Sequence, residues 1–228
     1  MNGPKSRALV IGDQERAPYH PLGAVRGAIA DILAPSFLPE FSTDYESVKD
    51  LGRDELLVSY TDCWKFPPSD TQVAAVVDHV AGGGGLLVLH CGISLQSRPE
   101  FAQLIGARFT GHPPMQELRF VSATDADQLF VRRPDENHPE YPRPGNPIAT
   151  PAFDLLEEPY RFEFDPLAGI TVVWVYEMEG TRYPAAWIRR FGMGRVVYTM
   201  PGHWLASFQG QDYRTYLCDI ACWAAKKC

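Results

Sequence analysis

A-G-G-G-G-L-L-V-L-H-C-G-I-S-L-Q, residues 81–96, is the stretch of sequence that decides the fold. The apolar run 86–89 is too short for a helix and is preceded by glycines, so it predicts a strand that is buried on both faces. Such a strand belongs in the centre of an open α/β sheet. Ligands of these sheets bind just beyond the carboxyl ends of the strands. His90, Cys91 and Gly92 follow this strand directly, so we expect the functional site there.

The glycines at 82–85 allow two interpretations. A loop that cradles a phosphate follows a strand and opens a helix, whereas these glycines follow a helical pattern and precede a strand. The order of elements therefore favours the end of a helix and a turn. The helix begins near Ser69 or Asp70, either of which can cap its first turn, and valines recur along one of its sides.

The chain before the central strand alternates between strand and helix patterns. Residues 8–11, 37–43 and 56–60 are short apolar runs that predict strands, and 23–33 has the spacing of a helix. A strand that is followed by a helix and then by further strands is typical of a parallel sheet with helices on its faces.

The chain after the central strand is richer in turns. Residues 101–105 predict a short helix and 117–122 a strand, while the proline-rich stretch 132–151 predicts a loop of unusual length. Three β-rich runs separated by turn residues then predict an antiparallel extension of the sheet, before a final helix. The runs are 171–176, 184–188 and 195–199, and the helix is 212–225. The fold class is therefore α/β, a three-layer sandwich with a mostly parallel central sheet and an antiparallel extension.

Composition limits the classes of protein. The 228 residues, 45% of them hydrophobic, can bury a sizeable core, and we expect a single domain over 1–228. A net charge of -7 without clustered Lys or Arg excludes an extended nucleic-acid interface. No apolar run approaches the roughly 20 residues of a membrane span, so we expect no membrane partner. Five cysteines without paired spacing suit reduced thiols, which predicts a cytoplasmic protein.

Four of the six histidines follow predicted strands or loop ends. They are His20, His90, His112 and His203. A single imidazole is usually an ordinary surface or core group. Four imidazoles that converge on one edge of a sheet are difficult to explain by structure alone, so we take this set as the candidate site. His79, inside a helix, and His138, inside the long loop, have no such placement.

Cys91 supports an alternative hypothesis. A thiol on a sharp turn after a buried strand can be a nucleophile, because the following helix N-terminus lowers its pKa. A cysteine hydrolase of the amidotransferase type also needs a late His-x-Glu to supply base and carboxylate. His203 is present, but Leu205 stands where that carboxylate is required. The pattern therefore disfavours hydrolysis by Cys91, and a small buried residue is the simpler interpretation.

The paired acids Glu157 and Glu158 are the candidate carboxylates. Such a pair is usually a solvated turn, but a carboxylate that lies near neutral imidazoles can act as a general acid or base, or as a metal ligand. Imidazoles together with a carboxylate suit zinc and related divalent ions. No two of the four histidines share a short ligand motif, so the sequence identifies no cofactor and leaves metal binding open.

With these residues in view, the chain resembles the ThuA-like family, the trehalose-utilisation proteins. The resemblance covers nearly the whole chain. It is carried by the Gly-rich turn, strand and histidine at 82–93, by Tyr19-His20, Gly111-His112-Pro113 and the acidic-acidic-x-Tyr segment at 157–160, and by a tail of four motifs in the family's order. The four tail motifs are Pro184-Ala185-Ala186-Trp187, Gly192-Met193-Gly194-Arg195-Val196, Gly202-His203 and Trp223-Ala224.

The resemblance implies a class I glutamine amidotransferase-like fold and the handling of sugars or sugar derivatives, often oxidised disaccharides. It is also compatible with a homo-oligomer. The leading hypothesis is a small carbohydrate-derived ligand in a cleft at the carboxyl edge of the sheet. His90 and His203 would be acid/base or ligand groups, with Glu158 as their carboxylate partner. The expected cleft-lining residues are Tyr19, His20, Trp64, Cys91 and His112. Two alternatives are the Cys91 hydrolase and a non-catalytic binding or assembly subunit, in which aromatic side chains fill the pocket and the histidines point apart.

Overall fold

The computed structural model describes residues 5–124, 127 and 151–227. Its elements, with η for short 3-10 helices, are β1 (Ser6–Gly12), α1 (Leu22–Leu33), β2 (Phe37–Ser42), η1 (Tyr45–Asp50), β3 (Leu56–Tyr60), α2 (Asp70–Ala81), β4 (Gly85–Leu89), η2 (His90–Ser97), α3 (Pro99–Ile105), β5 (Ala107–Gly111), β6 (Gln116–Ser122), β7 (Phe153–Glu157), β8 (Arg161–Phe164), β9 (Thr171–Met178), β10 (Thr181–Phe191), β11 (Gly194–Thr199), η4 (Leu205–Phe208) and α4 (Gln211–Ala224).

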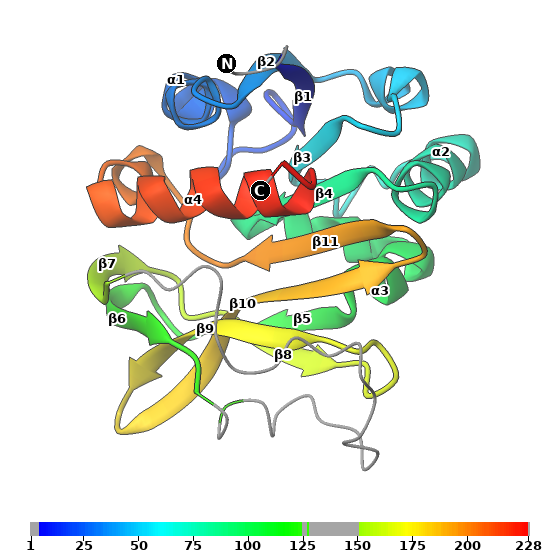
Figure 1. Ribbon diagram of the computed structural model, residues 1–228. Coiled ribbons are helices and arrows are strands. Elements are labelled where there is room, and N and C mark those ends of the chain that lie inside the picture. Colours follow the sequence, from blue (N-terminus) through cyan, green and yellow to red (C-terminus); the bar gives the residue numbers. More distant parts are fainter. Residues whose placement is uncertain (1–4, 125–126, 128–150, 228) are drawn as a thin grey trace.

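One large sheet runs through the described residues. Its nine strands have the order β2-β1-β3-β4-β11-β10-β9-β6-β7 (Figure 1). The pairs from β2 to β11 are parallel, and the pairs from β11 to β7 are antiparallel. The α/β class and the antiparallel extension are therefore confirmed, whereas the finer amidotransferase-like class stays a prediction. A second sheet pairs β5 with β8.

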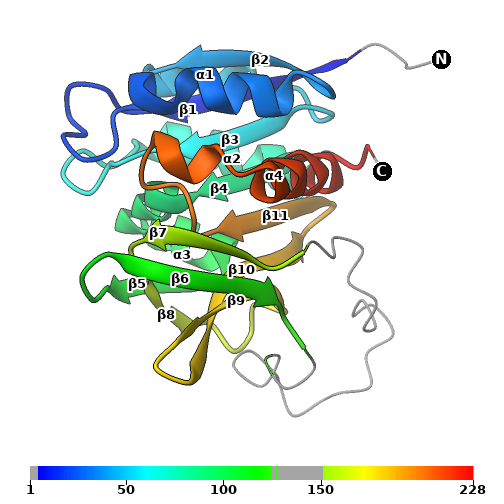
Figure 2. The same ribbon diagram turned by 90° about the vertical axis from the view of Figure 1, so that its left-hand side faces the viewer.

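Helices cover both faces of the parallel half. In Figure 2, α1 and α4 lie in front of the strands, and α2 and α3 lie behind them. Contacts of α1 with α4 and of α2 with α3 agree with this division into three layers. None of the helices described here combines the length and the apolar character that crossing a bilayer requires.

The central strand has the expected environment. Every residue of β4 is buried, and the strand pairs in parallel with β3 on one side and β11 on the other. The helix before it, α2, starts with a capping box in which Ser69 and Gln72 exchange hydrogen bonds. The glycines after Ala81 form the turn into β4, as predicted. They follow a helix and do not open one, so they do not form a phosphate loop.

The antiparallel half curls back towards the helices. The edge strand β7 contacts η4, and the Phe153 ring lies 5.5 Å from the ring of Tyr213 in α4. Three strands were not predicted from the sequence: β7 at the edge of this half, and β5 and β8, which form the second sheet. The predicted loop over 132–151 lies outside the described residues apart from its last position. The end of β7 is thus brought close to the loop that follows β11.

Candidate functional site

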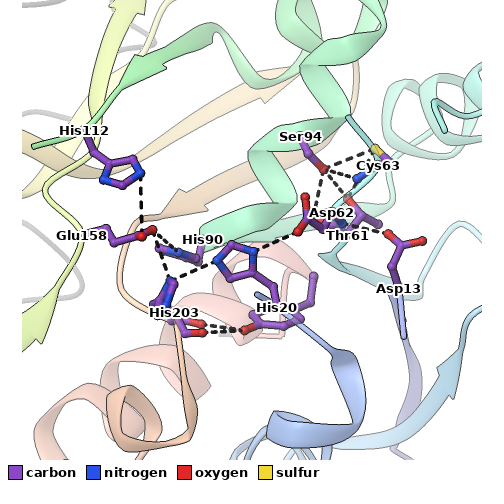
Figure 3. A network of polar contacts seen from close by, with 12 residues as sticks. Asp13, His20, Thr61, Asp62, Cys63, His90, Ser94, His112, Glu158 and His203 are labelled. Atoms are coloured by element: carbon purple, nitrogen blue, oxygen red, sulfur yellow. Dashed lines mark hydrogen bonds and ion pairs between the residues drawn. The ribbon is translucent and has the colours of Figure 1, made fainter. Parts of the chain in front are cut away.

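Polar side chains follow the carboxyl ends of four parallel strands and lie at one edge of the sheet. His20 follows β1, Asp62 follows β3, His90 follows β4 and His203 follows β11. Because neighbouring parallel strands end at the same edge, residues that are distant in the sequence meet there. Figure 3 shows three of the imidazoles directed towards one another and towards Glu158.

The cluster of His20, His90, His203 and Glu158 is compact. Nε2 of His20 lies 3.1 Å from Nδ1 of His203, which in turn lies 3.2 Å from Oε2 of Glu158. Nε2 of His90 lies 3.5 Å from the same carboxylate oxygen. His90 is completely buried and His20 is buried, whereas Glu158 and His203 are half-buried. We call these four residues the imidazole cluster.

Glu158 reaches the cluster because its neighbour Glu157 is anchored. Glu157 ends β7, is fully buried, and accepts hydrogen bonds from the backbone N–H of Gly202 at 2.9 Å and from the hydroxyl of Ser207. Burial raises the pKa of Glu157 to about 7. The bond to Gly202 ties the end of β7 to the loop that carries His203, which holds Glu158 beside that imidazole.

Partners on the far side of two rings fix their orientation. Nδ1 of His90 lies 2.6 Å from the carbonyl oxygen of Met200, so it donates its proton there and leaves Nε2 as an acceptor. Nδ1 of His20 lies 3.1 Å from a carboxylate oxygen of Asp62, and its Nε2 likewise faces the cluster. Asp62 is held in turn by a hydrogen bond from its N–H to Asp13 at 2.8 Å. Nε2 of both imidazoles therefore faces the interior of the cluster, where Nε2 of His90 also lies 3.0 Å from the hydroxyl of Tyr160.

Burial and the carboxylate set the charge of the cluster. Burial lowers the pKa of His90 to about 4, so its ring is neutral at pH 7. Burial also opposes charge on His203, but the hydrogen bond and the negative charge of Glu158 outweigh this effect and raise the pKa of His203. Although burial alone would raise the pKa of Glu158, the hydrogen bond and charge of His203 and the contact with His90 lower it well below its usual range. The site thus holds one ionised carboxylate beside three imidazoles.

The sharp turn after β4 is made by His90, not by Cys91. His90 has φ 41°, a left-handed conformation that non-glycine residues adopt mainly at functional or strained positions. Cys91 is 2% exposed and points into the core, and burial raises the pKa of its thiol well above its usual value. A buried, protonated thiol is a poor nucleophile and cannot contact a ligand at the surface. The structure therefore gives no support to Cys91 as a cleft-lining residue or nucleophile.

The remaining predicted residues lie around the cluster at different distances. His112, which is exposed, has its Nε2 3.7 Å from the other oxygen of Glu158. Trp64 is 43% exposed, and its ring lies 6.1 Å from that of Phe109, which in turn lies 4.3 Å from the tilted ring of Tyr160. Tyr19 is 76% exposed. Within the described residues the histidines converge, so the arrangement expected for a non-catalytic subunit, with histidines pointing apart, is not observed.

Three residues have roles in the site that the sequence did not indicate, although Glu157 was among the candidate carboxylates. Asp62 orients His20, Glu157 anchors the His203 loop, and the hydroxyl of Tyr160 lies 3.0 Å from Nε2 of His90. Asp62 follows a predicted strand at the same edge, which is the signal that could have found it. Tyr160 and Glu157 depend on β7 and β8, which the sequence pattern did not predict.

The imidazole cluster has the donor set of a metal site. One ligand atom from each of its four residues lies within 4.8 Å of the other three. Three imidazole nitrogens and a carboxylate oxygen suit zinc and related divalent ions. The same groups also suit proton transfer, because a neutral imidazole, a protonatable imidazole and a carboxylate lie within hydrogen-bonding reach of one another.

Fold and site together define the class of protein: an α/β protein with a histidine and carboxylate site at the carboxyl edge of its parallel strands. A family model described as ThuA, trehalose utilisation, matches residues 38–224. The chain therefore belongs to the ThuA family.

Solved structures share this fold over nearly the full chain. A protein described as ThuA-like from Parabacteroides merdae has a TM-score of 0.70 and 15% identity, covering 97% of this chain and 90% of that chain. Another from Bacteroides uniformis has a TM-score of 0.70 and 15% identity, covering 98% and 93%. A β-galactosidase from Rahnella sp. R3 has a TM-score of 0.62 and 12% identity, with 96% of this chain matching 31% of that chain. At such identities the similarity concerns the fold alone. No curated protein sequence matches significantly.

Proposed function

We propose that this protein binds and transforms a small carbohydrate-derived ligand at the imidazole cluster. The observation that carries the proposal is the meeting of three imidazoles and one carboxylate at the strand ends, in a chain of the ThuA family. Family membership points to trehalose utilisation, and the open edge of a parallel sheet is the usual place for a small ligand. The cytoplasm is the location that we propose for this activity.

Aromatic side chains beside the cluster support a sugar ligand. Trp64, Phe109 and Tyr160 form a continuous wall that leads from the exposed rim to His90. Trp204, next to His203, is exposed on the loop after β11. The faces of aromatic side chains pack against the apolar faces of sugar rings. The hydroxyl groups at the edges of a sugar ring remain free to accept or donate hydrogen bonds. We propose that this wall holds the ring and that polar groups of the cluster contact its oxygens.

Proton transfer at a carbon next to a carbonyl is the chemistry that we propose. His203 and Glu158 form a hydrogen-bonded pair that can take up a proton from the ligand, and the half-buried position of both keeps them accessible. The proton leaves the carbon, the electron pair moves onto the carbonyl oxygen, and return of a proton from the pair completes the exchange. No oxidant or reductant is needed for this step.

The experiment uses a disaccharide with a ring ketone as the probe and trehalose as its parent compound. In D₂O the wild-type protein is expected to exchange the hydrogen next to the carbonyl for deuterium, as measured by mass spectrometry of the recovered sugar. His203→Gln and Glu158→Gln should lose about 10²-fold or more of this rate, the usual contribution of a general acid or base. His79→Gln, on the distant end of α2, is the matched histidine control and should retain it.

Two outcomes would contradict the proposal. One is an unchanged exchange rate in folded His203→Gln and Glu158→Gln. The other is a wild-type protein that neither exchanges nor binds the ketone probe or trehalose in saturation-transfer NMR. Far-ultraviolet circular dichroism of each variant establishes that it is folded.

A further inference from the structure

We infer that the imidazole cluster is a mononuclear site for a divalent transition ion, with zinc as the best fit. The ligands are Nε2 of His20, Nε2 of His90, Nδ1 of His203 and Oε2 of Glu158. The inference concerns the same site as the proposed function and rests on it for the role of the ion. With the ion bound, His203 and Glu158 act as its ligands, and the proton transfer passes to the polar groups beside them.

Three of the six separations between these atoms are close to those around a coordinated ion. In a tetrahedral zinc site with bonds of about 2.0–2.1 Å, neighbouring ligand atoms lie about 3.3 Å apart. The separations here are 3.1 Å from His20 to His203, 3.2 Å from His203 to Glu158 and 3.5 Å from His90 to Glu158. All four atoms lie within 4.8 Å of one another. Only small side-chain movements are therefore needed to close the site around one ion.

The groups that hold the ligand side chains are arranged as in known metal sites. A metal-binding histidine commonly donates its other ring N–H to a carboxylate or a backbone carbonyl, which fixes the tautomer and the direction of the lone pair. His20 has this contact with Asp62 at 3.1 Å, and His90 has it with the Met200 carbonyl at 2.6 Å. Two of the three imidazoles are thus orientated for coordination by separate, independent partners.

Two polar side chains beside the cluster remain available for proton transfer when an ion is bound by the four ligand atoms. The Tyr160 hydroxyl is 3.0 Å from Nε2 of His90, and His112 is 3.7 Å from the second oxygen of Glu158. Neither is needed to complete the ligand set. Both lie where they could donate a proton to, or accept one from, a ligand oxygen that the ion polarises.

Zinc titration tests the site directly. Tag-free protein is treated with a chelator, dialysed, and titrated with ZnCl₂ by calorimetry. We expect one zinc ion per chain. His20→Ala and Glu158→Gln should each weaken binding by more than about 100-fold, and Asp62→Asn by about 10- to 100-fold, the range found for second-layer partners. His112→Gln, in the same site but outside the ligand set, should bind zinc as the wild-type protein does.

Cobalt provides a measurement that does not depend on variants. Addition of CoCl₂ to the wild-type protein should give the ligand-field absorption of a site with low coordination number, without a thiolate charge-transfer band. Cys222→Ser tests a second possible pair of metal ligands among the described residues, the half-buried Cys218 and Cys222 on α4, and should leave zinc binding unchanged.

Three results would overturn the inference: no zinc uptake by the wild-type protein, zinc uptake that folded Glu158→Gln and His20→Ala retain, or loss of uptake in Cys222→Ser. Failure here is separate from failure of the proposed function. If zinc does not bind but His203→Gln still abolishes exchange of the ketone probe, only the metal site is wrong. If zinc binds but no sugar probe is recognised, the carbohydrate proposal is wrong.

Discussion

At the scale of single residues, the site depends on close approach between the β4 turn and the β11 loop. Gly202 has φ +145°, and a Cβ atom there would lie 3.1 Å from Cβ of His90 and 3.2 Å from the ring of Phe208. Tyr60 adds a hydrogen bond from its hydroxyl to the Gly202 carbonyl at 2.8 Å. Glycine is therefore the residue that lets His203 reach His90.

Gly202→Ala should destabilise the protein by about 1–3 kcal/mol, because alanine is strained at this φ and its methyl group presses on His90. The matched control is Gly27→Ala, an exposed position inside α1 where a Cβ meets nothing within 4 Å. That change should stabilise the protein by about 0.5–1 kcal/mol through helix propensity. Urea unfolding of both variants measures the difference, and equal free energies of unfolding would contradict the account.

At the scale of elements, the sequence predicted those parts of the fold whose pattern is local. The helix that starts at Ser69, the glycine turn after Ala81 and the buried strand β4 follow from capping residues, glycines and an apolar run. The strands β5, β7 and β8 are four or five residues long and only partly buried, so each is too short for its pattern to be recognised in the sequence. His20, His90 and His203 could be placed because each follows a predicted strand. Glu158 could be named as a candidate, but its approach to His203 depends on the curl of the sheet.

The turn from α2 to β4 provides a pH prediction. A Cβ at Gly84 would lie 2.2 Å from the His79 ring, so the glycine makes room for this buried imidazole. Burial lowers the pKa of His79 below its usual value of about 6.5. Below that pH the unfolded chain binds more protons than the folded chain, so this contribution to stability is present above pH 6.5 and is lost on acidification.

The measurement compares the wild-type protein with His79→Gln by urea unfolding at pH 7.5 and pH 5.5. The free energy of unfolding should fall more steeply towards the lower pH for the wild-type protein than for His79→Gln. The difference between their free energies of unfolding should therefore be smaller at pH 5.5 than at pH 7.5. Each unit by which the folded pKa lies below the unfolded one corresponds to about 1.4 kcal/mol. A gap that widens on acidification would mean that the folded state favours the charged ring.

At the scale of the whole molecule, one sheet joins the parallel and antiparallel halves. Strand β11 pairs with β4 on one side and β10 on the other, and the imidazole cluster draws on both halves. The two halves should therefore unfold together. With Trp64, Trp204 and Trp223 replaced by phenylalanine, tryptophan fluorescence reports on the antiparallel half through the buried Trp174 and Trp187. Circular dichroism reports on all helices. The two signals should give coincident urea transitions, and separate midpoints would contradict a single cooperative unit.

The central claim is that three imidazoles from distant parts of the chain form one ligand site. Long-range ¹H–¹⁵N spectra of the histidine rings measure this most directly, before and after addition of the ketone disaccharide. The account predicts that His20 and His90 both carry a proton at Nδ1, and that the His90 ring is neutral at pH 7. It also predicts that the probe shifts the signals of His20, His90 and His203 together while those of His79 stay in place. Signals of the three rings that do not respond to the probe, or that respond independently of one another, would contradict the claim.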